Sequence, residues 1–281
     1  MSATGQPARA RRVVIAERAQ VTPTLVVRRA LPTAGLPAVG PWVLLDHFGP
    51  LAVPHGDRGT EPHPHAGIET VTYLFAGSMH HRDSLGHEGR VGPGGAQWMT
   101  AGRGLVHAER PGGGEPLHGL QLWTKLPRAI QFAEPAYQNL LEGDLPVFRA
   151  GDADVRVVGG TLAGHASPAG TRSPLLLAHL AFAGAGRVEL PVPAAFELAL
   201  YVAAGEASVG EVRAAVGTLV CLSGGSAVGL STSGPADVML LGGARLEEPL
   251  VFHGPFVMDS AAAIRQAERA YVTGEMGTLA A

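Results

Sequence analysis

The chain has 281 residues, and 21 Lys and Arg stand against 24 Asp and Glu, which gives a formal net charge of −3. This near balance argues against recognition of nucleic acid through bulk charge. A single cysteine, Cys221, excludes an internal disulfide and is typical of a reducing compartment, so we expect a cytoplasmic protein. The length suits two domains, and no apolar run is long enough to span a bilayer.

The predicted elements are mostly strands. Near the N-terminus, no long apolar run follows Arg9, Arg11 and Arg12, so this segment does not resemble a secretory signal. We expect a loose tail there. Further along, 39 glycines and 22 prolines punctuate short apolar runs, which is typical of strands joined by turns in a sandwich or barrel. A weak helix is predicted within residues 126–140, where two prolines interrupt it. The clearest helix is predicted within residues 258–277, with Asp259 or Ser260 as its cap.

Two segments of the chain resemble each other. Residues 61–77 align without a gap over residues 189–205, and identities include a glutamate (Glu69 and Glu197) and a tyrosine (Tyr73 and Tyr201). This indicates one β unit present twice, although chance similarity between two strands rich in Ala and Gly is the alternative. We therefore expect two domains, at residues 1–142 and 143–281.

The two copies differ at polar positions. The alignment, continued with residues 94–109 over residues 217–232, places His63, His65, His107 and Glu109 over Pro191, Pro193, Leu230 and Thr232. The second copy therefore lacks the candidate metal ligands of the first. Glu69 keeps a glutamate as its counterpart where the histidines do not, so we expect a structural role for Glu69.

Two pairs of polar residues have the spacing of metal ligands on strands. His63 and His65 in "PHPHAGIETVTYL" are two residues apart, as are His107 and Glu109 in "AGRGLVHAE", and in a strand such residues point to the same face. Pro64 has no N–H to donate, which favours a sheet edge or barrel rim. Three imidazoles and a carboxylate suit a divalent transition metal with open positions. Fe(II) fits best; Mn, Ni, Cu and Co stay possible, and three histidines alone could hold Zn.

The other histidines are weaker candidates for ligands. His80, His81 and His87 lie in the polar stretch "GSMHHRDSLGHEGR", for which we expect a solvated hairpin, with a lid over the site as the alternative. His47 and His118 are expected to make hydrogen bonds near the barrel mouth or to support the ligands.

These motifs resemble those of the pirin family of the cupin superfamily, and the resemblance covers nearly the whole chain. It rests on "DHFGP" (46–50), "PHPHAGIETVTYL" (62–74), "HRDSLGHEGRVGPGGAQWMTAGRGLVHAE" (81–109), "LHGLQLW" (117–123) and "GPFVMDS" (254–260). The resemblance implies an all-β bicupin, with two cupin-type β-barrels packed face to face and a short C-terminal helix. It also implies one metal in the N-terminal barrel, held by His63, His65, His107 and Glu109 and not by Glu69.

Members of this family are linked to two different functions. Some cleave flavonols such as quercetin with O2, and others are regulators whose metal oxidation state changes the binding of protein partners. We favour a quercetin 2,3-dioxygenase-like enzyme, because open coordination positions in an internal pocket have little use in a purely structural site. Its substrates would be a planar phenol and O2, and Glu109 could take the hydroxyl proton as catalytic base.

An apolar wall would complete the substrate pocket. Phe48, Trp98, Met99 and Leu120 are candidates for this wall, and ordinary barrel core is the alternative. The non-enzymatic regulator with protein partners is the alternative function. We expect neither a nucleic acid nor a membrane partner, and we take a monomer as the default.

Overall fold

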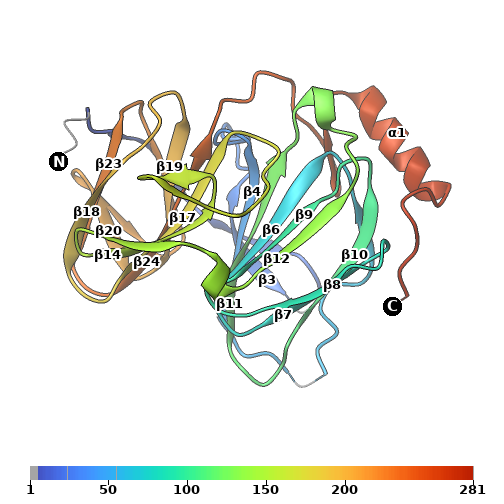
Figure 1. Ribbon diagram of the computed structural model, residues 1–281, viewed down its shortest axis with the longest axis horizontal. Coiled ribbons are helices and arrows are strands. Elements are labelled where there is room, and N and C mark those ends of the chain that lie inside the picture. Colours follow the sequence, from blue (N-terminus) through green and yellow to red (C-terminus); the bar gives the residue numbers. More distant parts are fainter. Residues whose placement is uncertain (1–5, 24, 55, 281) are drawn as a thin grey trace. The chain divides into compact units, whose positions relative to one another are not determined.

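Strands dominate the structure because the apolar runs of the chain are short and end at turn residues. The computed structural model describes residues 6–23, 25–54 and 56–280. Two compact units are present, and each contains one large and one small antiparallel sheet (Figure 1). The first barrel is Ala19–Val27, Val43–Asp144 and Leu246–Ala281, and the second barrel is Met1–Arg18, Arg28–Trp42 and Leu145–Arg245.

The first barrel has a seven-stranded and a four-stranded sheet. The order in the large sheet is β12 (Ala136–Leu140), β9 (Ala96–Thr100), β6 (Ile68–Ala76), β11 (Leu117–Lys125), β4 (Trp42–Leu51), β3 (Val26–Leu31) and β2 (Glu17–Gln20). The order in the small sheet is β5 (His63–His65), β10 (Leu105–Pro111), β7 (Met79–Asp83) and β8 (Glu88–Val91).

The second barrel repeats this arrangement. Its large sheet has the order β1 (Ala10–Ile15), β22 (Thr218–Leu222), β19 (Glu197–Ala204), β24 (Ala236–Gly243), β17 (Leu175–Phe182), β14 (Ala153–Gly159) and β13 (Val147–Ala150). Its small sheet has the order β18 (Gly186–Pro191), β23 (Ala227–Thr232), β20 (Glu206–Val209) and β21 (Val212–Ala215).

The remaining elements are short. Two hairpins pair β15 (Thr161–Leu162) with β16 (His165–Ala166) and β25 (Val251–His253) with β26 (Phe256–Met258), and two 3-10 turns cover Arg128–Ile130 and Glu142–Asp144. The α-helix α1 (Ala261–Val272) is capped by Ser260, whose hydroxyl accepts a hydrogen bond from the backbone N–H of Ala263 at 3.2 Å. In the part of the chain that the structure describes, no helix has the length and apolar character needed to cross a bilayer.

The strand register confirms the internal repeat. Tyr73 on β6 pairs with Ala96 on β9, and Tyr201 on β19 pairs with Leu219 on β22, as the sequence alignment requires. The predicted all-β fold with two barrels and a short C-terminal helix is therefore confirmed.

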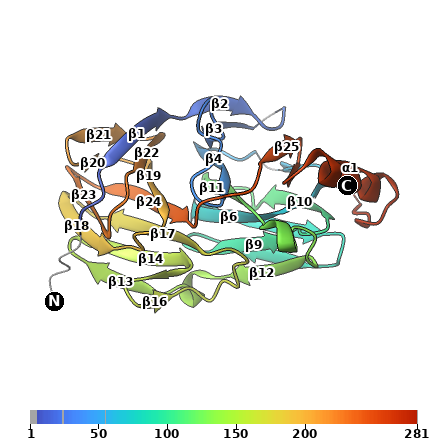
Figure 2. The same cartoon turned by 90° about the horizontal axis from the view of Figure 1, so that it is seen from above.

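The division of the chain between the barrels differs from the predicted boundary at residues 142 and 143. The N-terminal strand β1 pairs with β22 and forms the edge of the large sheet in the second barrel (Figure 2). Residues 246–281, including α1, pack with the first barrel instead. The expected loose tail is therefore a paired strand, in which the Arg12 guanidinium donates a hydrogen bond to the carbonyl oxygen of Ala34 at 3.0 Å.

Two further expectations were wrong. The weak helix predicted within residues 126–140 is a single 3-10 turn followed by β12, which pairs with β9. The alignment of His63 with Pro191 is displaced by three residues: His63 pairs with His107 as Val188 pairs with Leu230. The reason is that two residues separate β5 from β6, whereas five separate β18 from β19.

Candidate metal centre

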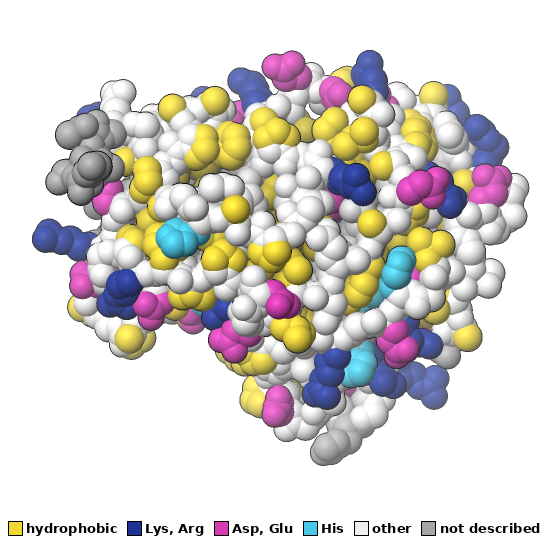
Figure 3. Space-filling model, in the orientation of Figure 1, with side chains coloured by type: hydrophobic (Ala, Val, Ile, Leu, Met, Phe, Trp, Pro, Cys, Tyr) yellow, Lys and Arg dark blue, Asp and Glu magenta, His cyan; other side chains and the backbone are white. Residues whose placement is uncertain are grey.

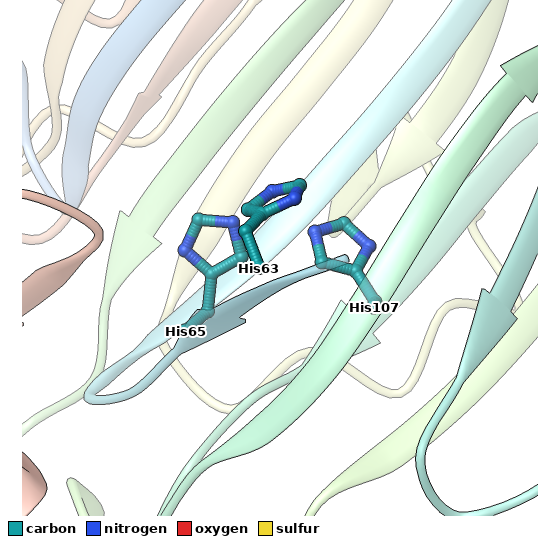
Figure 4. A group of neighbouring side chains, drawn as sticks. All are labelled: His63, His65 and His107. Carbon is teal, nitrogen blue, oxygen red and sulfur yellow. The ribbon is translucent and has the colours of Figure 1, made fainter. Parts of the chain in front are cut away.

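Three histidines converge on the inner face of the small sheet in the first barrel. His63 and His65 lie on β5, and His107 lies directly opposite His63 on β10. One ring nitrogen of each residue lies within 4.8 Å of those of the other two, and the three rings face one another (Figure 4). The ring centroids are 4.4 Å apart for His63 and His107 and 4.9 Å apart for His63 and His65. We call these three residues the histidine triad.

Burial keeps two of these imidazoles neutral. It lowers the pKa of His65 to about 3, with a further contribution from the charge of His63, although the hydrogen bond to Pro255 opposes the shift. Burial, followed by the charges of His65, His63 and His81, also lowers the pKa of His107 well below its usual value. Neutral imidazoles offer lone pairs to a cation without first losing a proton.

Hydrogen bonds behind the triad determine which nitrogen carries the lone pair. The Nδ1–H groups of His63 and His65 donate to the carbonyl oxygens of Glu61, at 2.8 Å, and Pro255, at 3.0 Å. Both Nε2 atoms are therefore free to act as ligands. Nε2 of His107 is buried without a hydrogen-bond partner, which a native structure rarely tolerates unless another group occupies the site.

The C-terminal segment contributes to this centre because it packs beside β5. The backbone N–H of Val257 donates to the carbonyl oxygen of Ala66 at 3.2 Å. Gly67 has a φ of 79°, and a Cβ there would lie 2.2 Å from the carbonyl oxygen of Val257, so only glycine permits this approach. The carbonyl of Pro255 reaches His65 from this segment.

Glu109 lies on the same face of β10 as His107, but its carboxylate is outside the group of three nitrogens. The Thr72 hydroxyl lies 2.6 Å from Glu109 Oε1 and 2.7 Å from Gln121 Oε1, and it has one proton to donate between them. Among the described residues, no hydrogen bond reaches Glu109 Oε2. The carboxylate is thus tethered by one oxygen beside the triad, with the other available.

Sequence reasoning missed two residues next to the triad. His81 on β7 pairs with Glu109, Asp83 pairs with His107, and both are buried. The expected solvated hairpin is therefore wrong for His81, although it holds for Arg82, which is exposed. The signal in the sequence was the spacing of His81 and Asp83, which matches that of His107 and Glu109.

The four residues expected to form a substrate wall divide between the two faces of the large sheet. Met99 pairs with Thr70 and shares the face of Thr72 that looks toward the triad. Trp98 and Leu120 lie on the opposite face and are buried there, as the alternative of ordinary core requires. Phe48 packs in a buried apolar cluster with Leu74, on the triad side.

Trp123, by contrast, was not predicted and lies beside the triad. It pairs with Thr70, and its ring meets His65 edge to face with centroids 4.8 Å apart. Its indole Nε1 is buried without a hydrogen-bond partner, so the site offers one unused donor near the triad.

Glu69 is on the far face of β6 from the triad. Its carboxylate oxygens accept hydrogen bonds from Thr100 at 2.8 Å and Thr124 at 3.4 Å. This placement agrees with the structural role expected for Glu69. His47 and His118 are also hydrogen-bonded to each other, with their Nε2 atoms 2.8 Å apart, as expected.

The outer face of the same small sheet is chemically different. A cavity of about 490 Å³ borders this face and also reaches Glu109; it is lined by mixed charges, namely Arg58, Glu61, His80, Arg82, Glu88 and Arg110, together with Thr60, Pro62 and Ala108. In the view of Figure 3, basic, acidic and histidine side chains gather over the region of β7 and β8. The inner face is therefore the part of this sheet that suits a metal.

The residues of the inner face fit a bound metal ion. Three imidazoles, each with one ring nitrogen within 4.8 Å of those of the other two, form a set of nitrogen ligands, and a nearby carboxylate can supply a fourth ligand. The orphaned Nε2 of His107 is the observation that most directly requires a partner. The donor set alone does not select one metal.

Comparisons with known proteins match most of the chain. The family model described as "Pirin" matches residues 24–124, and the one described as "Pirin C-terminal cupin domain" matches residues 177–277. A pirin-like protein of Solanum lycopersicum is 36% identical over 257 residues, which cover 90% of this chain and 87% of that protein. Pirin of Homo sapiens is 36% identical over 250 residues, which cover 86% of this chain and 84% of that protein.

A solved structure extends the similarity to the whole chain. The crystal structure of quercetin 2,3-dioxygenase from Acinetobacter baumannii superposes with a TM-score of 0.90 at 28% sequence identity. The match covers 98% of this chain and 100% of that one.

Proposed function

The chain belongs to the pirin family, and from this premise we propose that it is a metal-dependent dioxygenase that cleaves planar phenols of the flavonol type, such as quercetin. The observation that carries the proposal is the histidine triad, in which burial keeps His65 and His107 neutral and Nε2 of His107 has no hydrogen-bond partner. The Acinetobacter baumannii protein with the same fold bears the name of this activity, which supports the choice of substrate class.

We propose His63, His65, His107 and Glu109 as the ligands of one divalent ion, with Fe(II) favoured and Ni, Mn, Cu, Co or Zn as alternatives. Such an ion lowers the pKa of a bound hydroxyl and orients the substrate and O2. The carbonyl oxygens of Glu61 and Pro255 hold His63 and His65, so the orientation of these two ligands is preorganised before any metal binds.

Glu109 has a second proposed role as catalytic base. Its Oε1 accepts from the Thr72 hydroxyl, and this hydrogen bond fixes the carboxylate on the triad side of β10. Oε2 can then take the proton of a flavonol hydroxyl, provided that the substrate places that hydroxyl within about 3 Å of it. Met99 and Phe48 would contact the rings, and the indole N–H of Trp123 could donate to a substrate oxygen.

The experiment uses protein loaded with Fe(II) without oxygen. Quercetin is added anaerobically, its absorbance is recorded, and O2 is then admitted. We expect the flavonol band to shift on binding and to disappear after O2, with release of carbon monoxide. The matched control is His107→Ala, which should show neither change. A stable flavonol band in the loaded wild-type protein after O2 would overturn the proposal.

The regulator hypothesis predicts a different result from the same preparation. A regulator must bind a protein partner with different affinity when its metal is reduced and when it is oxidised. Pull-down with the two forms of the loaded protein distinguishes this hypothesis from catalysis.

A further inference from the structure

We propose that Asp83 and His81 form a hydrogen-bonded chain that orients His107 toward the metal, so that both act as positioning residues. This inference rests on the proposed metal site and extends it to two residues that do not contact the ion.

The chain begins at a buried carboxylate and ends at the triad. Asp83 Oδ2 lies 3.4 Å from His81 Nε2, and His81 Nδ1 lies 3.5 Å from His107 Nδ1. All three side chains share the inner face of the small sheet, because Asp83 pairs with His107 and His81 pairs with Glu109. Each of the three residues is at most 3% exposed.

The direction of each hydrogen bond follows from the ionised carboxylate, which can only accept. His81 therefore carries its proton on Nε2, facing Asp83, and presents a lone pair on Nδ1. His107 must then carry its proton on Nδ1, which donates to His81. The lone pair of His107 is left on Nε2, the nitrogen that has no hydrogen-bond partner.

Neighbouring groups hold this chain in place. Asp83 Oδ1 accepts from the backbone N–H groups of Leu85 at 2.9 Å and His87 at 3.0 Å, and Oδ2 also faces the His87 ring at 2.8 Å. The His81 ring stacks on Tyr137 with centroids 4.3 Å apart and planes 9° apart. Asp83 and the His81 ring are therefore both held in place.

The three ligands differ in how they are oriented. Backbone carbonyls accept from the Nδ1–H groups of His63 and His65, whereas the partner of His107 is a side chain. A single substitution can therefore remove the support of His107 while leaving that of the other two in place.

The second barrel provides an internal comparison. Its β20 pairs with β23 so that Ala207 occupies the position of His81, and Val209 is the next residue on the same face, as Asp83 is on β7. Both belong to the apolar core of that barrel. The equivalent positions in the barrel that lacks the triad are therefore apolar. If the polar chain had only a structural role, it would not need to be lost together with the triad.

A structural role for Asp83 in the turn after β7 is the competing explanation, because its Oδ1 closes that turn. The test therefore uses full-length apo protein and measures its affinity for cobalt(II) by competition with a chelator, together with the visible absorption of the bound ion. His81→Leu removes the acceptor at similar volume. His81→Asn restores an oxygen close to the position of Nδ1. Asp83→Asn keeps an acceptor for the turn but presents an amide N–H to His81.

We expect His81→Leu and Asp83→Asn to bind cobalt about 10- to 100-fold more weakly, with an altered visible spectrum, and His81→Asn to recover most of that loss. His80→Leu, on the outer face of the same strand, should stay within about threefold of wild type.

The proposal is overturned if His81→Leu and Asp83→Asn both bind cobalt within about threefold of wild type, or if His81→Asn is as weak as His81→Leu. Thermal unfolding of each apo variant is recorded alongside. If His81→Leu fails to fold, the cobalt affinity of Asp83→Asn alone tests the proposal. Wild-type protein that takes up no cobalt overturns both the metal site and this chain. Intact cobalt binding without flavonol cleavage overturns only the dioxygenase.

Discussion

The small sheets of the two barrels have the same strand order and register, but their inner faces carry chemically different residues. In the first barrel this face carries His63, His65 and His107. The equivalent positions in the second barrel are Val188, Leu190 and Leu230. These three apolar residues belong to one buried cluster that fills the second barrel. The strand framework therefore tolerates either a polar centre or a dry core at the same positions.

This difference shows which residues belong to the framework and which to the site. Glu69 lies near the start of β6 and Glu197 begins β19, the equivalent strand, and Tyr73 and Tyr201 occupy equivalent buried positions on these strands. These residues are therefore present with and without the triad. A buried imidazole without a partner is unfavourable, and a bound metal removes that cost. The apolar face of the second barrel needs no such partner.

The largest effect is expected when the first barrel is made like the second. His107→Leu introduces the residue found at Leu230 and removes one nitrogen ligand. The affinity for a divalent metal should fall by more than the roughly 10- to 100-fold loss that follows removal of an outer hydrogen-bond partner. Elemental analysis of the variant after loading and dialysis measures the remaining metal.

The stability of the same variant without metal provides its control. Burial already disfavours the charged form of His107, so an apolar side chain of similar size should leave the apo protein as stable as wild type or more stable. A variant that retains stoichiometric metal would show that His107 is not a ligand.

The converse change should not create a site. Leu230→His places an imidazole among Val188, Leu190 and Val209, none of which can accept its hydrogen bond or bind a metal. We expect the free energy of unfolding to fall by about 2–4 kcal/mol, from lost apolar burial and an unsatisfied polar group. Urea unfolding measures this cost. Metal uptake above that of wild type would contradict the expectation that one histidine is insufficient.

Sequence patterns predicted the parts of this comparison that depend on local spacing. Two histidines two residues apart must share a face of a strand. The repeat also distinguished Glu69, which keeps a glutamate as its counterpart, from the candidate ligand His107, which does not keep a histidine. The Ser260 cap and the helix after it also follow from local rules.

The parts that were missed depend on contacts between distant segments. His81 and Asp83 lie in a stretch rich in polar residues, and only the pairing of β7 with β10 shows that they are buried. The pairing of β1 with β22 and the contact of Pro255 with His65 join residues about two hundred positions apart, which no local pattern encodes. The displaced alignment of His63 arose from a difference in loop length, which an ungapped comparison cannot detect.

The smallest effect concerns the framework glutamates themselves. Glu69 is fully buried and accepts from Thr100 and Thr124, whereas the side chain of Glu197 is 44% exposed and its ion pair with Arg245 is long, at 3.6 Å. Glu69→Gln should therefore lower the free energy of unfolding by about 1–2 kcal/mol, because the amide replaces an oxygen that accepts a buried hydrogen bond. Glu197→Gln should change it by less than about 0.5 kcal/mol, since solvent screens the exposed pair.

Both variants should bind cobalt as wild type does, because Glu69 faces away from the triad and Glu197 belongs to the barrel without one. Urea unfolding and cobalt titration of the two proteins side by side test this. Loss of cobalt binding in Glu69→Gln alone would mean that this carboxylate contributes to binding of the ion. The assignment of Glu69 to the strand framework and not to the metal site would then be wrong. Equal stability losses in both variants would instead show that burial does not distinguish the two glutamates.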